Sequence, residues 1–201
     1  MISIREVTQH TIIIKKSEFI CTLIPTSDIS SVDAYIKQYG KADASHNCYA
    51  YIIGNTERAS DDGEPSSTAG LPMLNVLKMQ GLSNILAVVT RYFGGVKLGA
   101  GGLTRAYTNA VADTLKEANI IETELVPLYT IRVDYTYSKK LDYMIKSKDI
   151  PLMNQTYDDC VNYECYIKDQ SFIDAINDLS NGSAVIKKIK EDYIEKKLWC
   201  T

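Results

Sequence analysis

Two adjacent stretches of the sequence carry opposite charges and hold most of the residues that could do chemistry. The acidic residues of the first stretch are Glu57, Asp61, Asp62 and Glu64. No acidic residue occurs from Pro65 to Ala112, where the charges are all basic, at Lys78, Arg91, Lys97 and Arg105. Adjacent blocks of opposite sign can form one polar site, or they can simply pair with each other or with solvent.

A glycine-dense turn directly follows the apolar run Ile85–Phe93. Its glycines are Gly94, Gly95, Gly99, Gly101 and Gly102. Helical spacing starts at Leu103, so a strand, a glycine turn and a helix start are contiguous, which presents free backbone N–H groups to an anion. With Arg91, Lys97 and Arg105, the last expected in the first helical turn, these glycines form the candidate site for an anion or a nucleic acid. The alternative is that they only allow tight packing. The spacing fits neither the dinucleotide-binding nor the P-loop fingerprint.

A second interpretation of the same region is catalytic. His46, together with Asp61, Asp62, Glu64 and Arg91, could supply an acid, a base and an anion clamp for hydrolysis of a phosphate or acyl bond. No nucleophile elbow or other catalytic signature supports this hypothesis, and a histidine in a core hydrogen bond is the simpler interpretation of His46. The acidic loop is instead expected to act as an electrostatic lid whose carboxylates hold Arg91 and Arg105.

Cofactors, metals and membranes are not expected. The five cysteines are an odd number in a chain without an export signal, which favours reduced thiols and a cytoplasmic location. Cys160 and Cys165 have no nearby histidine that would complete a zinc site. The longest apolar runs fall far short of the roughly 18 residues that a membrane span needs.

The elements that must position these residues alternate between strand and helix. Strands are expected at Ile12–Ile14, Phe19–Ile24, Cys48–Ile53 and Ile85–Phe93. Helices are expected from about Ser30 to Gly40, from Pro72 to Gly81 and from Leu103 onward. The segment from Gly54 to Thr68 is rich in Asp, Ser, Gly and Pro and is predicted to be a loop.

From about Pro127 the pattern is strand, helix, strand, strand, helix, strand, which is the ferredoxin-like order. Glu122, Glu124 and Pro127 interrupt the periodic pattern, so we expect a hinge near residues 122–128 between domains at 1–124 and 127–201. The tyrosines of the second domain could stack on single-stranded RNA or merely cover a sheet face; they include Tyr135, Tyr137, Tyr163 and Tyr166. Acidic residues slightly outnumber basic ones after Val126, which argues against binding of a nucleic-acid backbone there.

Three motifs in order resemble the signature of the YigZ/IMPACT family. They are Ala44-Ser-His46-Asn-Cys-Tyr-Ala50, Ser60-Asp-Asp-Gly-Glu-Pro-Ser66 with Thr68-Ala-Gly70, and Val89-Thr-Arg-Tyr-Phe-Gly-Gly95 continuing through Lys97-Leu-Gly-Ala-Gly-Gly102 to Arg105-Ala-Tyr107. The resemblance covers nearly the whole chain. It implies an α+β or α/β chain with a ribosomal-protein-like βαβ domain, followed by a ferredoxin-like βαββαβ domain. Ser67 and Thr104 depart from the glycine and the valine that are usual in the family.

The resemblance also implies a link to translation. A eukaryotic branch of the family modulates translation by interfering with activation of an amino-acid-starvation kinase, through a chain with an additional interaction domain. The expected partners are therefore RNA, the ribosome, a translation factor or a small anionic ligand. A regulatory binding protein is the favoured function, and a hydrolase is the alternative.

Overall fold

The computed structural model describes residues 1–196. The chain divides into an N-terminal unit, Met1–Thr123 with Glu195 and Lys196, and a C-terminal unit, Glu124–Ile194. Cys200 lies outside the described residues, and the other four cysteines are free thiols. Among residues 1–196, no helix combines the length and the apolar character needed to cross a membrane.

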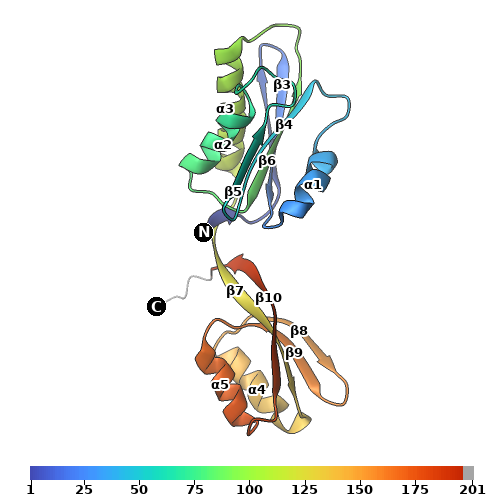
Figure 1. The fold of residues 1–201 in the computed structure, drawn as a ribbon, viewed down its shortest axis with the longest axis vertical. Coiled ribbons are helices and arrows are strands. Elements are labelled where there is room, and N and C mark those ends of the chain that lie inside the picture. Colours follow the sequence, from blue (N-terminus) through green and yellow to red (C-terminus); the bar gives the residue numbers. More distant parts are fainter. Residues whose placement is uncertain (197–201) are drawn as a thin grey trace. The chain divides into compact units, whose positions relative to one another are not determined.

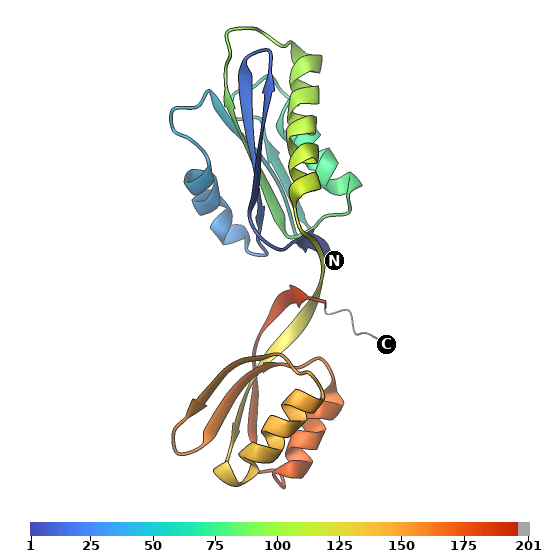
Figure 2. The ribbon, with the colours of Figure 1, turned by 180° about the vertical axis from the view of Figure 1, so that it is seen from behind.

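A five-stranded sheet with helices on both faces forms the N-terminal unit (Figures 1 and 2). Its strands, in spatial order, are β2 (Thr8–Ile14), β3 (Ser17–Pro25), β6 (Ile85–Tyr92), β4 (His46–Ile53) and β5 (Thr56–Ser60). All neighbouring pairs are antiparallel, so β3 and β4 run in the same direction on either side of β6. The 3-10 turn η1 (Ile29–Ser31) and helix α1 (Val32–Tyr39) connect β3 to β4. The predicted βαβ unit is therefore present, with β6 inserted between its strands.

The two faces of this sheet have separate cores. Helices α2 (Gly70–Met79) and α3 (Ala100–Glu117) cover one face, where Phe19, Cys21, Cys48 and Val89 are among the buried residues. Helix α1 covers the other face, over Ile24, Tyr51 and Val88 among others. Such alternation along each strand is expected when both faces of a sheet are buried. The short strand β1 (Ile2–Ile4) pairs with the beginning of β7 (Ile120–Val133).

A four-stranded ferredoxin-like sheet forms the C-terminal unit, which confirms the predicted element order. After β7 come α4 (Tyr135–Ser147), β8 (Leu152–Tyr157), β9 (Val161–Tyr166), α5 (Gln170–Leu179) and β10 (Val185–Glu195). The spatial order is β10-β7-β9-β8. Helices α4 and α5 lie on one face of this sheet (Figure 2). Its core includes Ile131, Leu141, Tyr163 and Phe172.

Three details differ from the sequence-based expectations. The segment from Gly54 to Thr68 contains the edge strand β5, which pairs with β4. Strand β7 begins at Ile120, before the predicted start at about Pro127. Of the two interpretations of the tyrosines, the stacking surface does not hold at Tyr163 and Tyr166, because Tyr163 is fully buried in the core and Tyr166 is 9% exposed, with its hydroxyl donating to Asp192 at 2.8 Å.

Candidate functional site

Arg91 occupies the centre of the candidate site because of its place in the sheet. On β6 it pairs in register with Phe19 of β3 on one side and with His46 of β4 on the other. Its guanidinium carbon lies 5.4 Å from the centre of the Phe19 ring and 5.6 Å from that of the Phe93 ring. These distances fit cation–π contacts. Arg91 is only 5% exposed, and its Nε has no hydrogen-bond partner among the described residues.

Glu64 neutralises this buried arginine. Its Oε1 accepts a hydrogen bond from Arg91 Nη1 at 2.5 Å and another from the Tyr107 hydroxyl at 2.9 Å. Glu64 is itself only 8% exposed, and a buried ion pair is tolerated only when such additional hydrogen bonds are present. The network continues to Cys48, whose Sγ lies 3.3 Å from the Tyr107 hydroxyl. Burial raises the pKa of the Cys48 thiol to about 12 and also raises the pKa of Tyr107, so both groups stay protonated at neutral pH.

His46 is held in a defined orientation beside this pair. Its Nδ1 lies 2.7 Å from the backbone carbonyl oxygen of Asp62. Because a carbonyl oxygen only accepts hydrogen bonds, Nδ1 carries a proton, and in the neutral ring Nε2 is an acceptor. His46 Nε2 lies 3.9 Å from Glu64 Oε2, which is too long for a hydrogen bond.

Asp61 and Asp62 organise the loop and do not reach the basic residues. Asp61 Oδ1 accepts from the backbone N–H groups of Ala69 and Gly70, and its Oδ2 accepts from that of Ser67. Although burial acts in the opposite direction, these three donors hold the pKa of Asp61 below its ordinary value. Asp62 Oδ2 accepts from the Asn47 N–H at 2.5 Å. Asp61 therefore caps the start of α2, and Asp62 fixes the loop to β4.

The glycine turn brings the beginning of α3 to the site. A β-carbon at Gly94 would lie 2.0 Å from the carbonyl carbon of Lys16, so only glycine fits this close approach to the β2–β3 turn. Gly99 precedes the helix with a φ of +72°, in the region that favours glycine. The first helical hydrogen bond is donated by Leu103 N–H to the Gly99 carbonyl, so the preceding amides of α3 have no helical acceptor.

A cavity of about 510 Å³ lies where these elements meet. It is lined by charged and polar residues at His46, Glu64, Arg91, Lys97 and Ser45, and by apolar residues that include Phe93, Leu98 and Leu103. Gly99 and Ala100 complete the wall at the start of α3. His46, Glu64, Arg91, Lys97 and Gly99 of the predicted site are thus brought together. The lining does not include Asp61, Asp62, Gly94, Gly95, Gly101, Gly102 or Arg105.

Arg105 differs most from the sequence-based expectation. Because α3 begins at Ala100, Arg105 lies in the second helical turn and not in the first. Its side chain is exposed, and no ion pair to the acidic loop is found for it in residues 1–196. Only Arg91 of the two arginines is held by a loop carboxylate, that of Glu64.

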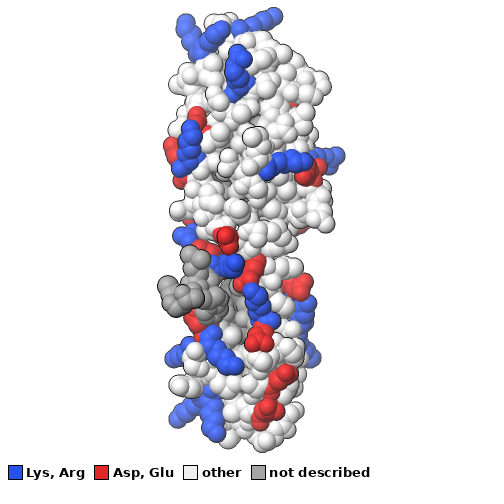
Figure 3. Space-filling model, turned by 90° about the vertical axis from the view of Figure 1, so that its left-hand side faces the viewer, with Lys and Arg blue, Asp and Glu red and all other residues white. Residues whose placement is uncertain are grey.

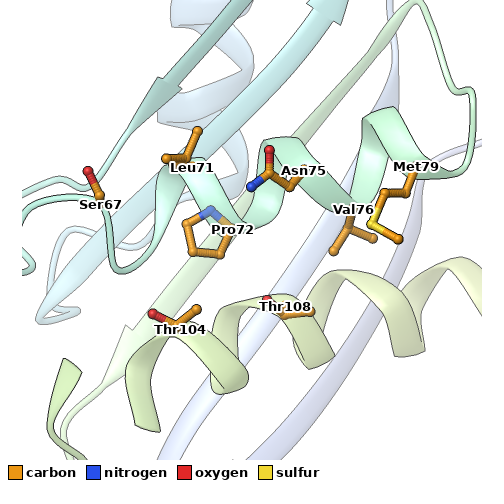
Figure 4. Close-up of a pocket in the computed structure, with 8 residues that line it drawn as sticks. All are labelled: Ser67, Leu71, Pro72, Asn75, Val76, Met79, Thr104 and Thr108. Carbon is orange, nitrogen blue, oxygen red and sulfur yellow. The ribbon is translucent and has the colours of Figure 1, made fainter. Parts of the chain in front are cut away.

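A second, smaller cavity of about 320 Å³ lies between α2 and α3 (Figure 4). It is lined by Ser67, Leu71, Pro72, Asn75, Val76, Met79, Thr104 and Thr108. None of these side chains is ionisable, and the surface of the N-terminal unit on this side is largely uncharged (Figure 3). Both residues that depart from the family pattern line it, and Ser67 has a φ of +62°, where glycine is favoured. No basic side chain lines this cavity, so it offers an anion no positive side-chain charge.

Sequence reasoning missed two residues that contribute to the site around the first cavity. Phe93 lines it and is 50% exposed, and its N–H donates to Ser45 Oγ at 3.1 Å. Tyr107 was expected only as a core residue on the apolar face of the helix, yet its hydroxyl holds Glu64. Its place in the Arg105-Ala-Tyr107 motif was the available signal. Within the described part of the chain, no group of three or more His, Cys, Asp or Glu residues could hold a metal ion.

Comparison with known proteins gives consistent matches. The model of the Impact N-terminal domain matches residues 15–115. IMPACT family member YvyE of Bacillus subtilis (strain 168) is 39% identical over 202 residues, which cover 96% of this chain and 93% of that protein. IMPACT family member YigZ of Escherichia coli (strain K12) is 32% identical over 188 residues, covering 89% and 92%. A crystal structure of a hypothetical protein, 30% identical, aligns with a TM-score of 0.67 over 95% of this chain and 98% of that one.

Proposed function

Because the chain belongs to the YigZ/IMPACT family, we propose that it is a translation-associated regulatory protein that binds the phosphate group of RNA or of another phosphorylated ligand. The binding site is the 510 Å³ cavity between β6 and the start of α3. The link to translation comes from the eukaryotic branch of the family, and the ribosome or a translation factor is the expected setting. Binding, and not turnover, is the favoured activity.

One observation carries this proposal: Lys97 and the open N-terminus of α3 line the same cavity. A helix N-terminus attracts an anion through its free N–H groups and its dipole, and a lysine adds a full positive charge. Lys97 forms no ion pair with another described residue, whereas Arg91 is already paired with Glu64. Lys97 therefore offers a positive charge that no carboxylate of the described chain neutralises.

The test compares Lys97, which lines the cavity, with Arg105, which does not. Lys97→Ala should weaken binding of single-stranded RNA and should lower the slope of log K against log salt by about 0.7, the loss of one phosphate contact. Arg105→Ala removes the same charge outside the cavity and serves as the matched control. Equal affinity and equal salt slope for Lys97→Ala and the wild type would contradict the proposal.

Arg91 is unsuitable for this test. Its replacement by alanine would leave the buried Glu64 without its cation, a change that typically costs about 3–5 kcal/mol of stability. Only the two exposed residues, Lys97 and Arg105, are therefore changed.

The hydrolase alternative is kept because of the orientation of His46. The Asp62 carbonyl fixes the proton on Nδ1, which leaves Nε2 as a base on the cavity wall. Asn can retain a donor to the Asp62 carbonyl but has no equivalent of Nε2. Phosphate-ester or acyl-ester hydrolysis that is present in the wild type and abolished in His46→Asn would favour the enzyme. No hydrolysis by the wild type would remove this alternative.

A further inference from the structure

Two hydrogen-bond acceptors face the same cavity without a donor between them. In the neutral tautomer, His46 Nε2 is an acceptor, and it lies 3.9 Å from Glu64 Oε2. Glu64 Oε1 is saturated by Arg91 and Tyr107, whereas Oε2 has no hydrogen bond from any described residue. Glu64 is more than nine-tenths buried and belongs to the cavity lining. Oε2 is therefore an unused acceptor at the cavity, where a donor on a ligand can reach it.

An aromatic ring forms another part of the wall. Phe93 is 50% exposed although it is large and apolar, and its backbone is fixed by the hydrogen bond to Ser45. The Arg91 guanidinium lies against the ring, which increases its rigidity as a surface. Exposed aromatic side chains beside a positive groove are the platforms on which nucleic-acid bases stack.

We propose that the cavity binds a ribonucleoside 5′-phosphate whose 2′- and 3′-hydroxyls are both free. This inference rests on the proposed function, because the phosphate occupies the site formed by Lys97 and the start of α3. The two hydroxyls donate to His46 Nε2 and Glu64 Oε2, and the base stacks on Phe93. The volume of about 510 Å³ suits one nucleotide, since ligand pockets typically range from about 300 to 1,000 Å³.

Other phosphorylated ligands fit these groups less well. Inorganic phosphate fills only the anion site and leaves both acceptors and the ring unused. A 2′-deoxynucleotide leaves one acceptor without a donor. Within an RNA chain the 3′-oxygen is esterified, so a free pair of hydroxyls occurs only in a free nucleotide or at the 3′ end of an RNA. These two sources share one chemistry, and the experiment separates them.

Calorimetric titration of the full chain with a series of probes tests the proposal. The series is inorganic phosphate, ribose 5-phosphate, AMP, 2′-deoxy-AMP and 2′,3′-dideoxy-AMP. We expect each removed hydroxyl to weaken binding by roughly tenfold, the value of one hydrogen bond to a charged or buried acceptor. Equal affinity for AMP and the dideoxy form would overturn this inference and leave the phosphate site standing. No binding of any probe would overturn the phosphate site, and the inference with it.

Two variants assign the groups separately. His46→Asn should reduce the preference for AMP over 2′,3′-dideoxy-AMP while affinity for inorganic phosphate persists. Phe93→Leu should abolish the advantage of AMP over ribose 5-phosphate and keep the preference for hydroxyls. Arg105→Ala, outside the cavity, should change neither ratio. AMP binding that is unaltered in His46→Asn and in Phe93→Leu would contradict the assignment.

Short RNAs of one sequence identify the source of the nucleotide. They end either in a free 3′ pair of hydroxyls or in a 3′-phosphate. Recognition of an RNA end is supported if the RNA with free 3′ hydroxyls binds more tightly than AMP and the RNA with a 3′-phosphate does not. Binding of AMP that equals or exceeds that of the free RNA end supports a free nucleotide. RNAs that bind more tightly than AMP but regardless of their 3′ group would overturn the proposal.

Discussion

Asp61 shows how one carboxylate can shape a site without entering it. Its two oxygens accept three backbone N–H groups at the start of α2 and in the preceding loop. The rest of the motif depends on this arrangement, because the same loop places Glu64 on Arg91 and the Asp62 carbonyl on His46. Of the two neighbouring aspartates, Asp61 therefore has the larger structural role.

Asp61→Asn should destabilise the N-terminal unit by about 1–2 kcal/mol at pH 7, as expected for the loss of a helix cap. The folded-state pKa of Asp61 is lowered, so its contribution is present above the unfolded value of 3.8 and is lost as the pH falls through the folded value. Urea unfolding from pH 7 to pH 3 should show the difference from the wild type shrinking. Asp33→Asn, on the exposed side of α1, is the control. A difference that persists unchanged at pH 3 would contradict this role.

Glu64 is predicted to limit anion binding in the absence of ligand. Glu64→Gln keeps the shape of the side chain but removes the charge that neutralises Arg91, so the variant should be less stable, and its folded form should bind inorganic phosphate more tightly by roughly 1 kcal/mol, about fivefold. Asp62→Asn should have a smaller effect, because Asp62 is exposed and bonds the Asn47 N–H. Titration at fixed ionic strength, with circular dichroism to verify folding, measures both. Weaker phosphate binding by Glu64→Gln would refute the lid.

At the scale of elements, the turn after β6 is the part that positions the site. It joins the strand that carries Arg91 to the helix whose first amides are free, and it packs at Gly94 against the turn between β2 and β3. Lys15 and Lys16 in that second turn both have positive φ angles. The two turns therefore constrain each other through this close backbone approach and through the hydrogen bond that the Gly94 N–H donates to Ser17 Oγ at 3.1 Å.

Gly94→Ala tests this contact. The added methyl group would lie 2.0 Å from the Lys16 backbone, a distance that no side-chain rearrangement relieves. We expect destabilisation by more than about 2 kcal/mol, in the range of strain at special backbone positions. Gly95→Ala is the comparison: Gly95 has no atom within 4 Å of an added β-carbon and should show only the cost of its φ of +82°. Thermal melts that show equal effects for the two would contradict the packing argument.

Sequence patterns predicted the elements in which the spacing of apolar residues reflects which side chains are buried. Strand β6 and the buried face of α3 were predictable because their apolar residues are continuous or helically spaced. Strand β5 was not, since it is a short edge strand whose residues are mostly exposed. Sequence alone could not decide between a stacking surface and a covered sheet face for Tyr163 and Tyr166, because a polar hydroxyl conceals how deeply an aromatic ring is buried. The pairing of Arg91 with Glu64 depends on the path of a loop, which no periodicity encodes.

At the scale of the whole molecule, the chain consists of two units with separate cores. The N-terminal unit carries the cavity, and the C-terminal unit has the ferredoxin-like order β10-β7-β9-β8. Strand β7 pairs with β1 at Ile120–Glu122 and with β9 from Leu128 onward. Residues 123–127 lie between these two ladders but inside the continuous strand β7, which also pairs with β10, so the hinge expected near residues 122–128 stays a prediction.

Limited proteolysis should therefore cut the chain near residues 122–128 and yield fragments that correspond to the two units. A protease of broad specificity such as subtilisin is suitable, because the segment contains few basic residues. Mass spectrometry of the early products locates the cut. Fragments whose ends fall inside either sheet, with none near this segment, would count against an independent pair of domains.

Helices α2 and α3 begin differently, and the difference suggests which ligands the start of α3 accepts. At α2, the Asp61 carboxylate already occupies the N-terminus from within the chain. At α3, Gly99 provides no side-chain cap. Asp61 thus occupies the start of α2 as an anionic ligand would occupy the start of α3, and it shows that a carboxylate satisfies such a position. Acetate and citrate should accordingly compete with phosphate at α3, so carboxylate buffers should weaken phosphate binding measured at fixed ionic strength.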